Sequence, residues 1–329
     1  MTITMEHGSG GRATSDLIEN IFLRYFDNPL IREMEDAAVT EGAEKIALTT
    51  DSFVVTPLFY DGGDIGRLAV CGTVNDLLVS GAVPKYLTCG FIIEEGMQGS
   101  DLEKIVASMK ETADEAGVCI VSGDTKVVEG KGGMYINTSG VGFMRKGVTL
   151  SAKKVKSGDK IILSGTLGEH HAAILKHRMN IKNGIKSDNA PLNEITEGLF
   201  KNGITVCEMR DVTRGGLATV IKEIAGAGGF SAELTEETIP VSEEVRDFSG
   251  LLGLDPLYMG NEGKLIVFVP ENEAERALGL IRMSRYGNGA SIIGEVTEGI
   301  KEGEVILRTE IGGKRRLDVL TGEGLPRIC

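Results

Sequence analysis

Apolar residues recur along this chain in two patterns, which together predict alternating helices and strands. The three-to-four-residue spacing of amphipathic helices occurs over residues 14–26, 63–80, 101–116, 169–178, 192–202, 217–227 and 271–283. Short apolar runs bounded by turn residues predict strands over 36–39, 46–52, 86–93, 118–121, 134–143, 160–163, 206–209, 230–234, 264–269, 291–297 and 304–309. We therefore expect an α/β (α+β) fold, in which each domain is a mixed sheet with helices packed on one face.

The domain organisation is indicated by a turn signal at Ser157-Gly158-Asp159, which places a boundary at 147–158. With 329 residues the chain is long enough for two separate cores. We expect four segments: a glycine-rich flexible leader with the first helix over 1–35, an N-terminal domain over 36–150, a C-terminal α/β domain over 151–317, and a mobile tail over 318–329.

Composition and charge restrict the possible functions. A net charge of −13 disfavours nucleic acid as a partner, because phosphate backbones require basic surfaces. No apolar stretch is long enough to cross a bilayer and no secretory signal is present, so we expect no membrane contact. The five cysteines include no C-x-x-C pair, which favours a reducing, cytoplasmic location. Four lie in apolar runs and are expected in the core, so only Cys329 is expected to be exposed.

The two ends of the chain are candidates for ligand chemistry. The leader reads His-Gly-Ser-Gly-Gly-Arg over residues 7–12, and its backbone N–H groups with Arg12 could surround a phosphate. The alternative is a mobile leader with no ligand. The last eight residues, 322–329, combine two glycines and a proline with a terminal cysteine, which could deliver the Cys329 thiol to a distant site. An ordinary frayed end is the alternative.

Carboxylates that end strands or lie at helix turns form the predicted metal site. Mg²⁺ prefers oxygen ligands and takes one or two carboxylates while leaving positions for phosphate. Each aspartate alone is compatible with a turn or cap, but five in such positions favour two or three ions. The predicted ligands are Asp36, Asp51, Asp76, Asp124 and Asp211.

Standard nucleotide and zinc motifs are absent from the sequence. There is no G-x-x-x-x-G-K-[ST] loop and no G-x-G-x-x-G fingerprint, so a nucleotide would have to bind through another fold. The four histidines show no zinc spacing with cysteine.

Several motifs together resemble the aminoimidazole-ribonucleotide-synthetase-like (PurM-like) ATP-binding superfamily, and with the terminal cysteine they resemble its hydrogenase-maturation carbamoyl dehydratases. The resemblance covers the whole chain. The motifs are the glycine-rich leader, Asp36-Ala-Ala-Val, Thr50-Asp51-Ser, Gly62-Gly63-Asp64-Ile65-Gly66, Gly72-Thr73-Val74-Asn75-Asp76-Leu77, Ser122-Gly123-Asp124-Thr125-Lys126, Asp211-Val212-Thr213-Arg214-Gly215-Gly216-Leu217 and Pro326-Arg327-Ile328-Cys329.

The resemblance implies ATP and Mg²⁺ as cofactors and an ATP-dependent dehydration of an S-carboxamide on Cys329 to an S-cyanide. It also implies a homodimer, the carbamoyltransferase HypF as donor, and the HypC–HypD complex as acceptor of the cyanide. The nucleotide-binding residues expected on this basis are Arg12, Asp51, Asn75, Asp76, Asp124 and Thr125.

The dehydration requires a base, for which the sequence offers two candidates besides the carrier Cys329. Lys126 beside Asp124 could bind phosphoryl oxygens or remove protons, or could simply form a salt bridge with Asp124. Glu262 in Gly260-Asn261-Glu262-Gly263 is the second candidate, with a solvated turn as the alternative.

Two other functions are compatible with these motifs. One is a small-molecule enzyme of the same fold, such as a thiamine-phosphate kinase or a selenophosphate synthetase, which would need no terminal thiol. The other is a non-catalytic carrier, which would consume no ATP.

Overall fold

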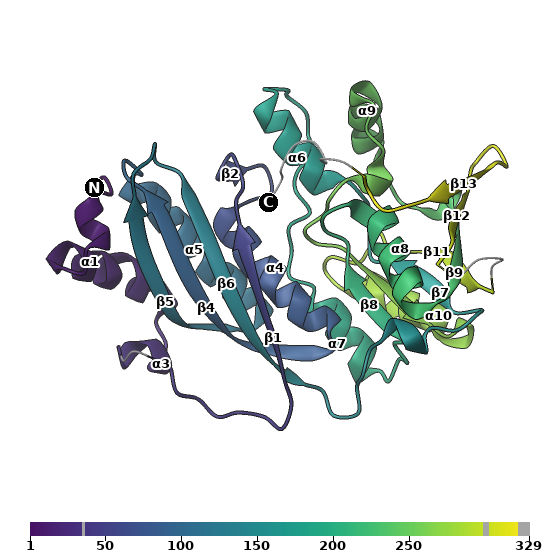
Figure 1. Cartoon of the computed structure of the whole chain (residues 1–329), viewed down its shortest axis with the longest axis horizontal. Helices are drawn as coiled ribbons and strands as arrows, with labels where there is room; N and C mark the ends of the chain where they lie inside the picture. The colour runs from purple at the N-terminus through teal and green to yellow at the C-terminus, as the bar shows by residue number, and fades with distance from the viewer. Residues whose placement is uncertain (35–36, 299–302, 322–329) are drawn as a thin grey trace. The chain divides into compact units, whose positions relative to one another are not determined.

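The protein is described by a computed structural model that covers residues 1–34, 37–298 and 303–321 (Figure 1). The described residues divide into two compact units: 1–34 and 37–78 with 82–146, and 79–81 with 147–298 and 303–321. Asp36 and Cys329, both predicted site residues, lie outside the described residues. Each unit is described by itself.

The N-terminal unit is built on a four-stranded mixed sheet of order β1-β6-β4-β5. Strand β4 pairs in parallel with β5, and the other pairings are antiparallel. A two-stranded ladder joins the short β2 and β3. The strands are β1 (Ile46–Phe53), β2 (Phe59–Tyr60), β3 (Gly63–Asp64), β4 (Ala82–Glu94), β5 (Cys119–Val128) and β6 (Met134–Met144).

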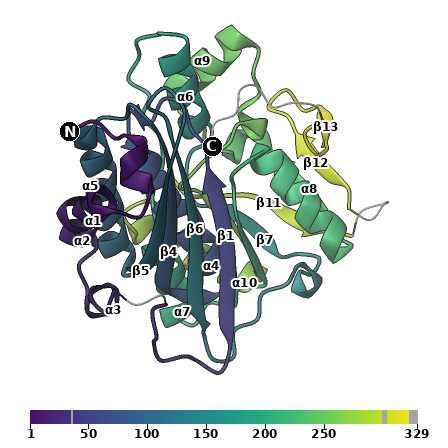
Figure 2. The same cartoon turned by 60° about the vertical axis from the view of Figure 1, so that its left-hand side comes forward.

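Helices α4 (Ile65–Val79) and α5 (Gly99–Ala116) lie on one face of this sheet, which Figure 1 shows from the other side and Figure 2 after a turn of 60°. Asp64 begins α4, because its Oδ1 accepts hydrogen bonds from the N–H groups of Gly66 (2.7 Å) and Arg67 (3.1 Å). The predicted arrangement of helices on one face is confirmed. The opposite face exposes apolar side chains from all four strands: Ile46, Leu48, Ile92, Val128 and Tyr135.

The leader is more ordered than the sequence suggested. It contains η1 (Met5–Gly8), a helix formed by α1 (Arg12–Leu17), η2 (Ile18–Phe22) and α2 (Leu23–Phe26), and α3 (Pro29–Arg32). Gly8 packs against β5, since a Cβ added there would lie 2.5 Å from the backbone nitrogen of Val127. The expected strand over 36–39 is not present at residues 37–39, which have no regular structure.

A seven-stranded sheet of order β13-β12-β9-β11-β7-β10-β8 forms the C-terminal unit. Only β12 and β9 pair in parallel. The strands are β7 (Lys160–Leu163), β8 (Glu208–Asp211), β9 (Ser231–Thr235), β10 (Leu265–Val269), β11 (Ser291–Thr297), β12 (Val305–Arg308) and β13 (Lys314–Leu317).

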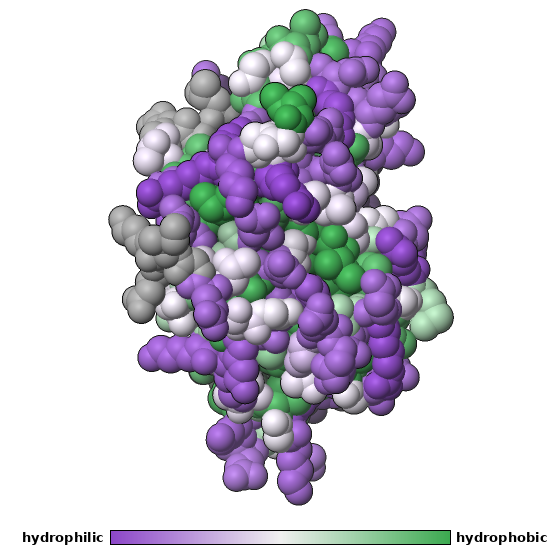
Figure 3. Space-filling view, turned by 90° about the vertical axis from the view of Figure 1, so that its right-hand side faces the viewer, coloured by the Kyte–Doolittle hydropathy of each residue, from purple (hydrophilic) through white to green (hydrophobic). Residues whose placement is uncertain are grey.

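The helices of this unit surround two apolar cores, the larger between α8 and the sheet and the smaller between α6 and α9. Helix α9 and strand β13 had no counterpart in the predicted elements. Figure 3 shows hydrophilic residues over most of the face it draws, with hydrophobic ones in separate small patches. The helices are η3 (Ala152–Lys154), α6 (Glu169–Arg178), α7 (Asn193–Lys201), α8 (Gly216–Gly228), η4 (Glu236–Thr238), α9 (Glu243–Leu252), η5 (Pro256–Tyr258) and α10 (Glu271–Met283).

The structure bears on two predictions from composition, one about membrane-spanning helices and one about the cysteines. Within the described residues, no helix is both long and apolar enough to span a bilayer. The prediction that all cysteines except Cys329 lie in the core is wrong for Cys119, which is exposed at the start of β5, whereas Cys71, Cys89 and Cys207 are buried.

Candidate functional site

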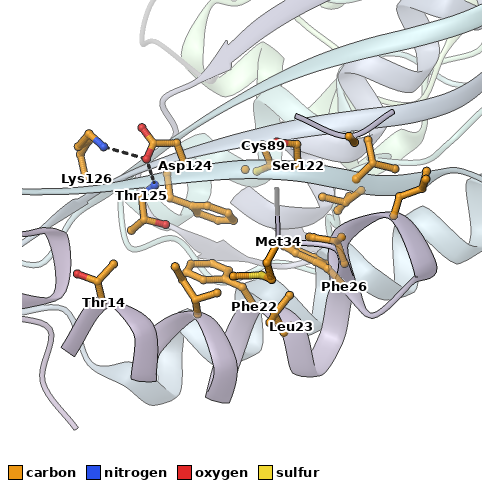
Figure 4. A pocket seen from close by; sticks show the side chains of 18 of the residues that line it. Thr14, Phe22, Leu23, Phe26, Met34, Cys89, Ser122, Asp124, Thr125 and Lys126 are labelled. Atoms are coloured by element: carbon orange, nitrogen blue, oxygen red, sulfur yellow. Dashed lines mark hydrogen bonds and ion pairs between the residues drawn. The ribbon is translucent and has the colours of Figure 1, made fainter. Parts of the chain in front are cut away.

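A pocket of about 270 Å³ lies in the N-terminal unit between the leader helices and β5. Its floor is apolar and includes Phe22 and Phe26 of the leader helix (Figure 4), together with Phe91 of β4. The Phe22 and Phe91 rings are 4.8 Å apart between centroids. Gly8 and Gly10 of the glycine-rich leader also line the pocket. The pocket therefore combines an apolar floor with backbone groups that could approach a ligand closely.

The predicted residues Asp124, Thr125 and Lys126 all line this pocket. They lie inside β5, which continues to Val128 instead of ending at residue 121 as expected. Because side chains alternate along a strand, Thr125 points toward the leader helix, whereas Asp124 and Lys126 point to the other side (Figure 4). Strand β5 is an edge strand, so the side chains on both of its faces lie at the rim of the pocket.

Lys126 and Asp124 form the ion pair that was the alternative interpretation of Lys126. The Lys126 Nζ donates to Asp124 Oδ1 at 2.8 Å, and the Thr125 N–H donates to the same oxygen at 2.9 Å. The hydrogen bond from Lys126 lowers the pKa of Asp124 below its usual value. The Lys126 side chain is 63% exposed, so it remains accessible to a ligand at the rim.

Asp51 and Asp76 lie along the contact between β1 and α4. The Asp51 Oδ2 is 3.7 Å from the position of a Cβ added at Gly72, one helical turn before Asp76. Asp76 Oδ2 accepts a hydrogen bond at 2.7 Å from the Oγ1 of Thr49, and Thr49 precedes Asp51 by two residues on β1. The structure therefore brings these two carboxylates to the same side of β1. Asn75, their neighbour on α4, is buried.

Asp51 and Asp124 do not converge within one chain. In the sheet register Asp51 pairs with Thr138, Thr138 with Cys89, and Cys89 with Gly123, the residue before Asp124. Three strand spacings separate the two by about 14 Å, and the two side chains point to opposite faces of the sheet. Across residues 1–34, 37–298 and 303–321, no three His, Cys, Asp or Glu side chains form a group that could hold a metal ion.

The other predicted residues lie apart from the pocket. Arg12 begins α1 with its side chain 95% exposed, 3.9 Å from Asp16. Asp211 is the last residue of β8 in the C-terminal unit, and it pairs in register with Leu265.

Glu262 lies in a buried turn at residues 260–264, at the same end of β8 and β10 as Asp211. The Val212 N–H donates to the Lys264 carbonyl at 2.9 Å, and the Asn261 N–H donates to the Val212 carbonyl at 3.2 Å. Glu262 is only 5% exposed. The alternative that Glu262 occupies a solvated turn is therefore wrong.

The turn is held on its other side by Asp188, which sequence analysis did not identify. Asp188 Oδ1 accepts from the Glu262 N–H at 3.1 Å, and Oδ2 accepts from the Gly263 N–H at 3.2 Å and from Lys264 Nζ at 2.8 Å. Burial alone would raise the pKa of Asp188, but the charge and hydrogen bond of Lys264 lower it overall. Because Asp188 is far from the turn in sequence, no local pattern could have indicated this contact.

Sequence analysis also did not identify the apolar floor of the pocket. The sequence predicted the helix that carries Phe22 and Phe26, but the apolar spacing of a helix gives no sign of whether its apolar face packs in a core or lines a pocket.

Comparisons with known proteins identify the family. The model for the AIR synthase related protein, N-terminal domain, matches residues 34–144, and that for the AIR synthase related protein, C-terminal domain, matches residues 156–306. Carbamoyl dehydratase HypE of Rhodobacter capsulatus is 45% identical over 335 residues, which cover 99% of this chain and 98% of that protein.

Two solved structures resemble the chain over nearly its whole length. The crystal structure of hydrogenase maturation protein HypE in complex with ATP is 45% identical, with a TM-score of 0.96 and full coverage of both chains. A chain in the crystal structure of a HypE–HypF complex is 47% identical, with a TM-score of 0.80, and the match covers 92% of this chain and 99% of that one.

Proposed function

The chain belongs to the HypE family of AIR synthase related proteins, and from this premise we propose that it is an ATP-dependent carbamoyl dehydratase acting on its own Cys329. The S-carboxamide oxygen on Cys329 takes the γ-phosphoryl group of ATP. Both amide protons then leave and the oxygen departs with phosphate, so the products are an S-cyanide, ADP and phosphate. The cyanide supplies the ligand of the iron in nickel–iron hydrogenase.

The pocket of the N-terminal unit is the proposed ATP site, and it is the single observation that carries the proposal. Its apolar floor suits a flat purine ring, because Leu23, Leu30 and Ile31 line it and are only partly buried, so they offer apolar surface to a ligand. Its rim suits phosphates, because Lys126 offers positive charge and Gly8 and Gly10 let the backbone approach a ligand closely. The relative of known structure was solved with ATP.

Phosphoryl transfer depends mainly on positioning and charge neutralisation, and the chain offers carboxylates for the cation that accompanies ATP. Mg²⁺, when bound, would neutralise the charge that develops on the phosphate oxygens. We propose Asp124 at the pocket rim, and Asp51 with Asp76 on the β1 side, as ligands. Because Asp51 and Asp124 are about 14 Å apart across three strand spacings and point to opposite faces of the sheet, they would not share one ion within a chain. Asp36 and Asp211 complete the proposed set.

We assign different roles to the two candidate bases. Lys126 binds phosphoryl oxygens, because its exposed ammonium group lies at the rim of the pocket. Glu262 removes the amide protons, because it is a carboxylate held in a rigid, buried turn. The remaining proposed nucleotide contacts are Arg12, Asn75 and Thr125.

The proposed partners follow from the family and from the surface of the N-terminal unit. A relative forms a complex with HypF, which we propose as the carbamoyl donor, with the HypC–HypD complex as the cyanide acceptor. The open face of the N-terminal sheet exposes Leu48 and four other large hydrophobic side chains, which supports a homodimer formed through that face. A cytoplasmic location stays a prediction.

Intact mass measurement tests the proposed reaction. In a first step, the full chain is carbamoylated by a HypF-type carbamoyltransferase with its substrates. In a second step, the carbamoylated chain is incubated with or without ATP. We expect carbamoylated Cys329 to lose the mass of one water only when ATP is present, and Asp76→Ala and Asp124→Ala to abolish that loss. Retention of the full carbamoyl mass with ATP present would indicate a passive carrier. ATP turnover that survives Cys329→Ala would indicate a small-molecule kinase.

A further inference from the structure

The turn that carries Glu262 is fixed in the C-terminal unit by hydrogen bonds from three other segments. From one side, the Asn261 side chain donates to the Val212 carbonyl at 3.0 Å and accepts from the Gly168 N–H at 2.7 Å. The Gly260 carbonyl accepts from the His171 N–H at 3.2 Å. These bonds fix the start of the turn, but they do not include the backbone of Glu262 itself.

The backbone of Glu262 is instead held by the segment 188–190. Asp188 accepts from the N–H groups of both Glu262 and Gly263, and the Glu262 carbonyl accepts from the Ala190 N–H at 3.3 Å. The two segments are so close that a Cβ added at Gly263 would lie 1.9 Å from the Asp188 carbonyl oxygen. The position of the Glu262 side chain therefore depends on the position of Asp188.

Asp188 is in turn held by Lys264. The side chains of Asp188 and Lys264 are 4% and 9% exposed, and their charged atoms are 2.8 Å apart. Buried ion pairs of this kind contribute little net stability, because desolvation offsets much of their attraction. They do restrict geometry, because a carboxylate that accepts three hydrogen bonds in a dry site has one arrangement that satisfies all of them. Two further titratable groups, Glu169 and His170, lie close enough to act on this pair electrostatically.

We propose that Asp188, anchored by Lys264, is a positioning residue for Glu262 and is required for the dehydration step but not for ATP binding. The inference rests on the proposed role of Glu262 as the base. Asp188 touches no reacting atom in this account. It acts by fixing the backbone from which the Glu262 carboxylate projects, and a displacement of about 1 Å in a catalytic group can cost about a hundredfold in rate.

The test is a double-mutant cycle on the dehydration step. Full-length chain is carbamoylated at Cys329, mixed with saturating ATP, and followed by intact mass through a single turnover. We expect Asp188→Asn to lower the rate constant by about tenfold to a hundredfold, with the KM for ATP unchanged. Because Asp188 acts only through Glu262, we expect Asp188→Asn to have no further effect in a Glu262→Gln background. A residue that merely stabilises the fold would lower the rate by the same factor in both backgrounds.

Asp159→Asn is the matched control. Asp159 is also a buried aspartate of the C-terminal unit that accepts a backbone hydrogen bond, from Lys156 at 2.8 Å. It precedes β7 and forms no hydrogen bond or ion pair with the turn in the described structure, so we expect an unchanged rate. If Asp188→Asn does not fold, Asp188→Asn with Lys264→Met replaces it, because this double variant removes both charges of the buried pair.

The outcomes separate this inference from the proposed function. A wild-type rate for Asp188→Asn, or an equal loss in both backgrounds, overturns the positioning role, while a lowered rate for Glu262→Gln leaves the proposed function standing. A wild-type rate for Glu262→Gln overturns the assignment of Glu262 and the positioning role with it.

Discussion

The Asp188–Lys264 pair makes a quantitative prediction about the stability of the C-terminal unit. Both side chains are almost completely buried, so removing one partner leaves the other charge without compensation in a dry site. Such a loss typically costs about 3–5 kcal/mol. We expect Lys264→Met to cost about 4 kcal/mol. Asp188→Asn should cost about 3 kcal/mol, because the amide oxygen can still accept one of the backbone hydrogen bonds.

The double variant distinguishes this mechanism from a general loss of packing. With both charges removed, neither is left buried without its partner, so the double variant should cost about 1–2 kcal/mol, less than either single change. Urea unfolding gives the free energies. Because two units can unfold separately, hydrogen exchange of the Glu262 and Gly263 amides reports on this unit alone. Lys201→Met, which removes one partner of an exposed pair with Glu197 on α7, is the control and should cost less than about 1 kcal/mol. Additive costs for Asp188→Asn and Lys264→Met would refute the reasoning.

Three other predictions concern pH, helix capping and assembly. Because Lys264 lowers the pKa of Asp188 despite its burial, ionised Asp188 contributes stability above about pH 4 that is lost as pH falls through the lower folded value. The difference in unfolding free energy between wild type and Asp188→Asn should therefore shrink in acid, and a difference that grows would contradict the ion pair. Burial raises the pKa of Asp64, which caps α4; Asp64→Asn should keep or increase the melting temperature at neutral pH, whereas Asp64→Ala should cost about 1 kcal/mol, and equal losses would exclude the cap. Leu48→Glu on the open sheet face should yield monomers by light scattering, while Leu251→Glu, an equally exposed position on α9, should stay dimeric; dimers in both would place the interface elsewhere.

The fold was largely accessible from the sequence, because most of its elements carry a strong local pattern. The expected helix over 271–283 and strand over 291–297 match α10 and β11 residue for residue. The apolar face of 101–116 likewise corresponds to α5, whose Leu102, Ile105 and Met109 are buried. In these segments the local period and the tertiary packing favour the same structure, so one pattern is sufficient.

The elements that were missed lack such a pattern. Strand β5 was expected to end at residue 121, because Ser122-Gly123-Asp124-Thr125-Lys126 contains no apolar run. It continues because β4 supplies a full parallel ladder as far as Val128. On an edge strand the polar side chains can reach solvent, so pairing alone maintains the strand. Residues 122–126, which were expected to follow the strand, are therefore part of it. Because side chains alternate along a strand, Thr125 and Lys126 lie on opposite sides of the pocket rim.

Glycine was the least informative residue in the sequence, because it is used both for mobility and for close approach. The glycine-rich leader suggested a loose segment and Gly263 suggested a solvated turn. In the structure, Gly8 lies where any Cβ would meet the Val127 nitrogen at 2.5 Å, and Gly263 lies where a Cβ would meet the Asp188 carbonyl oxygen at 1.9 Å. Both glycines therefore allow backbone to pack on backbone, one beside the proposed ATP pocket and one beside the proposed base. Since such contacts join segments distant in sequence and leave no room for adjustment, they favour preorganised sites in both units over sites that order only when a ligand arrives.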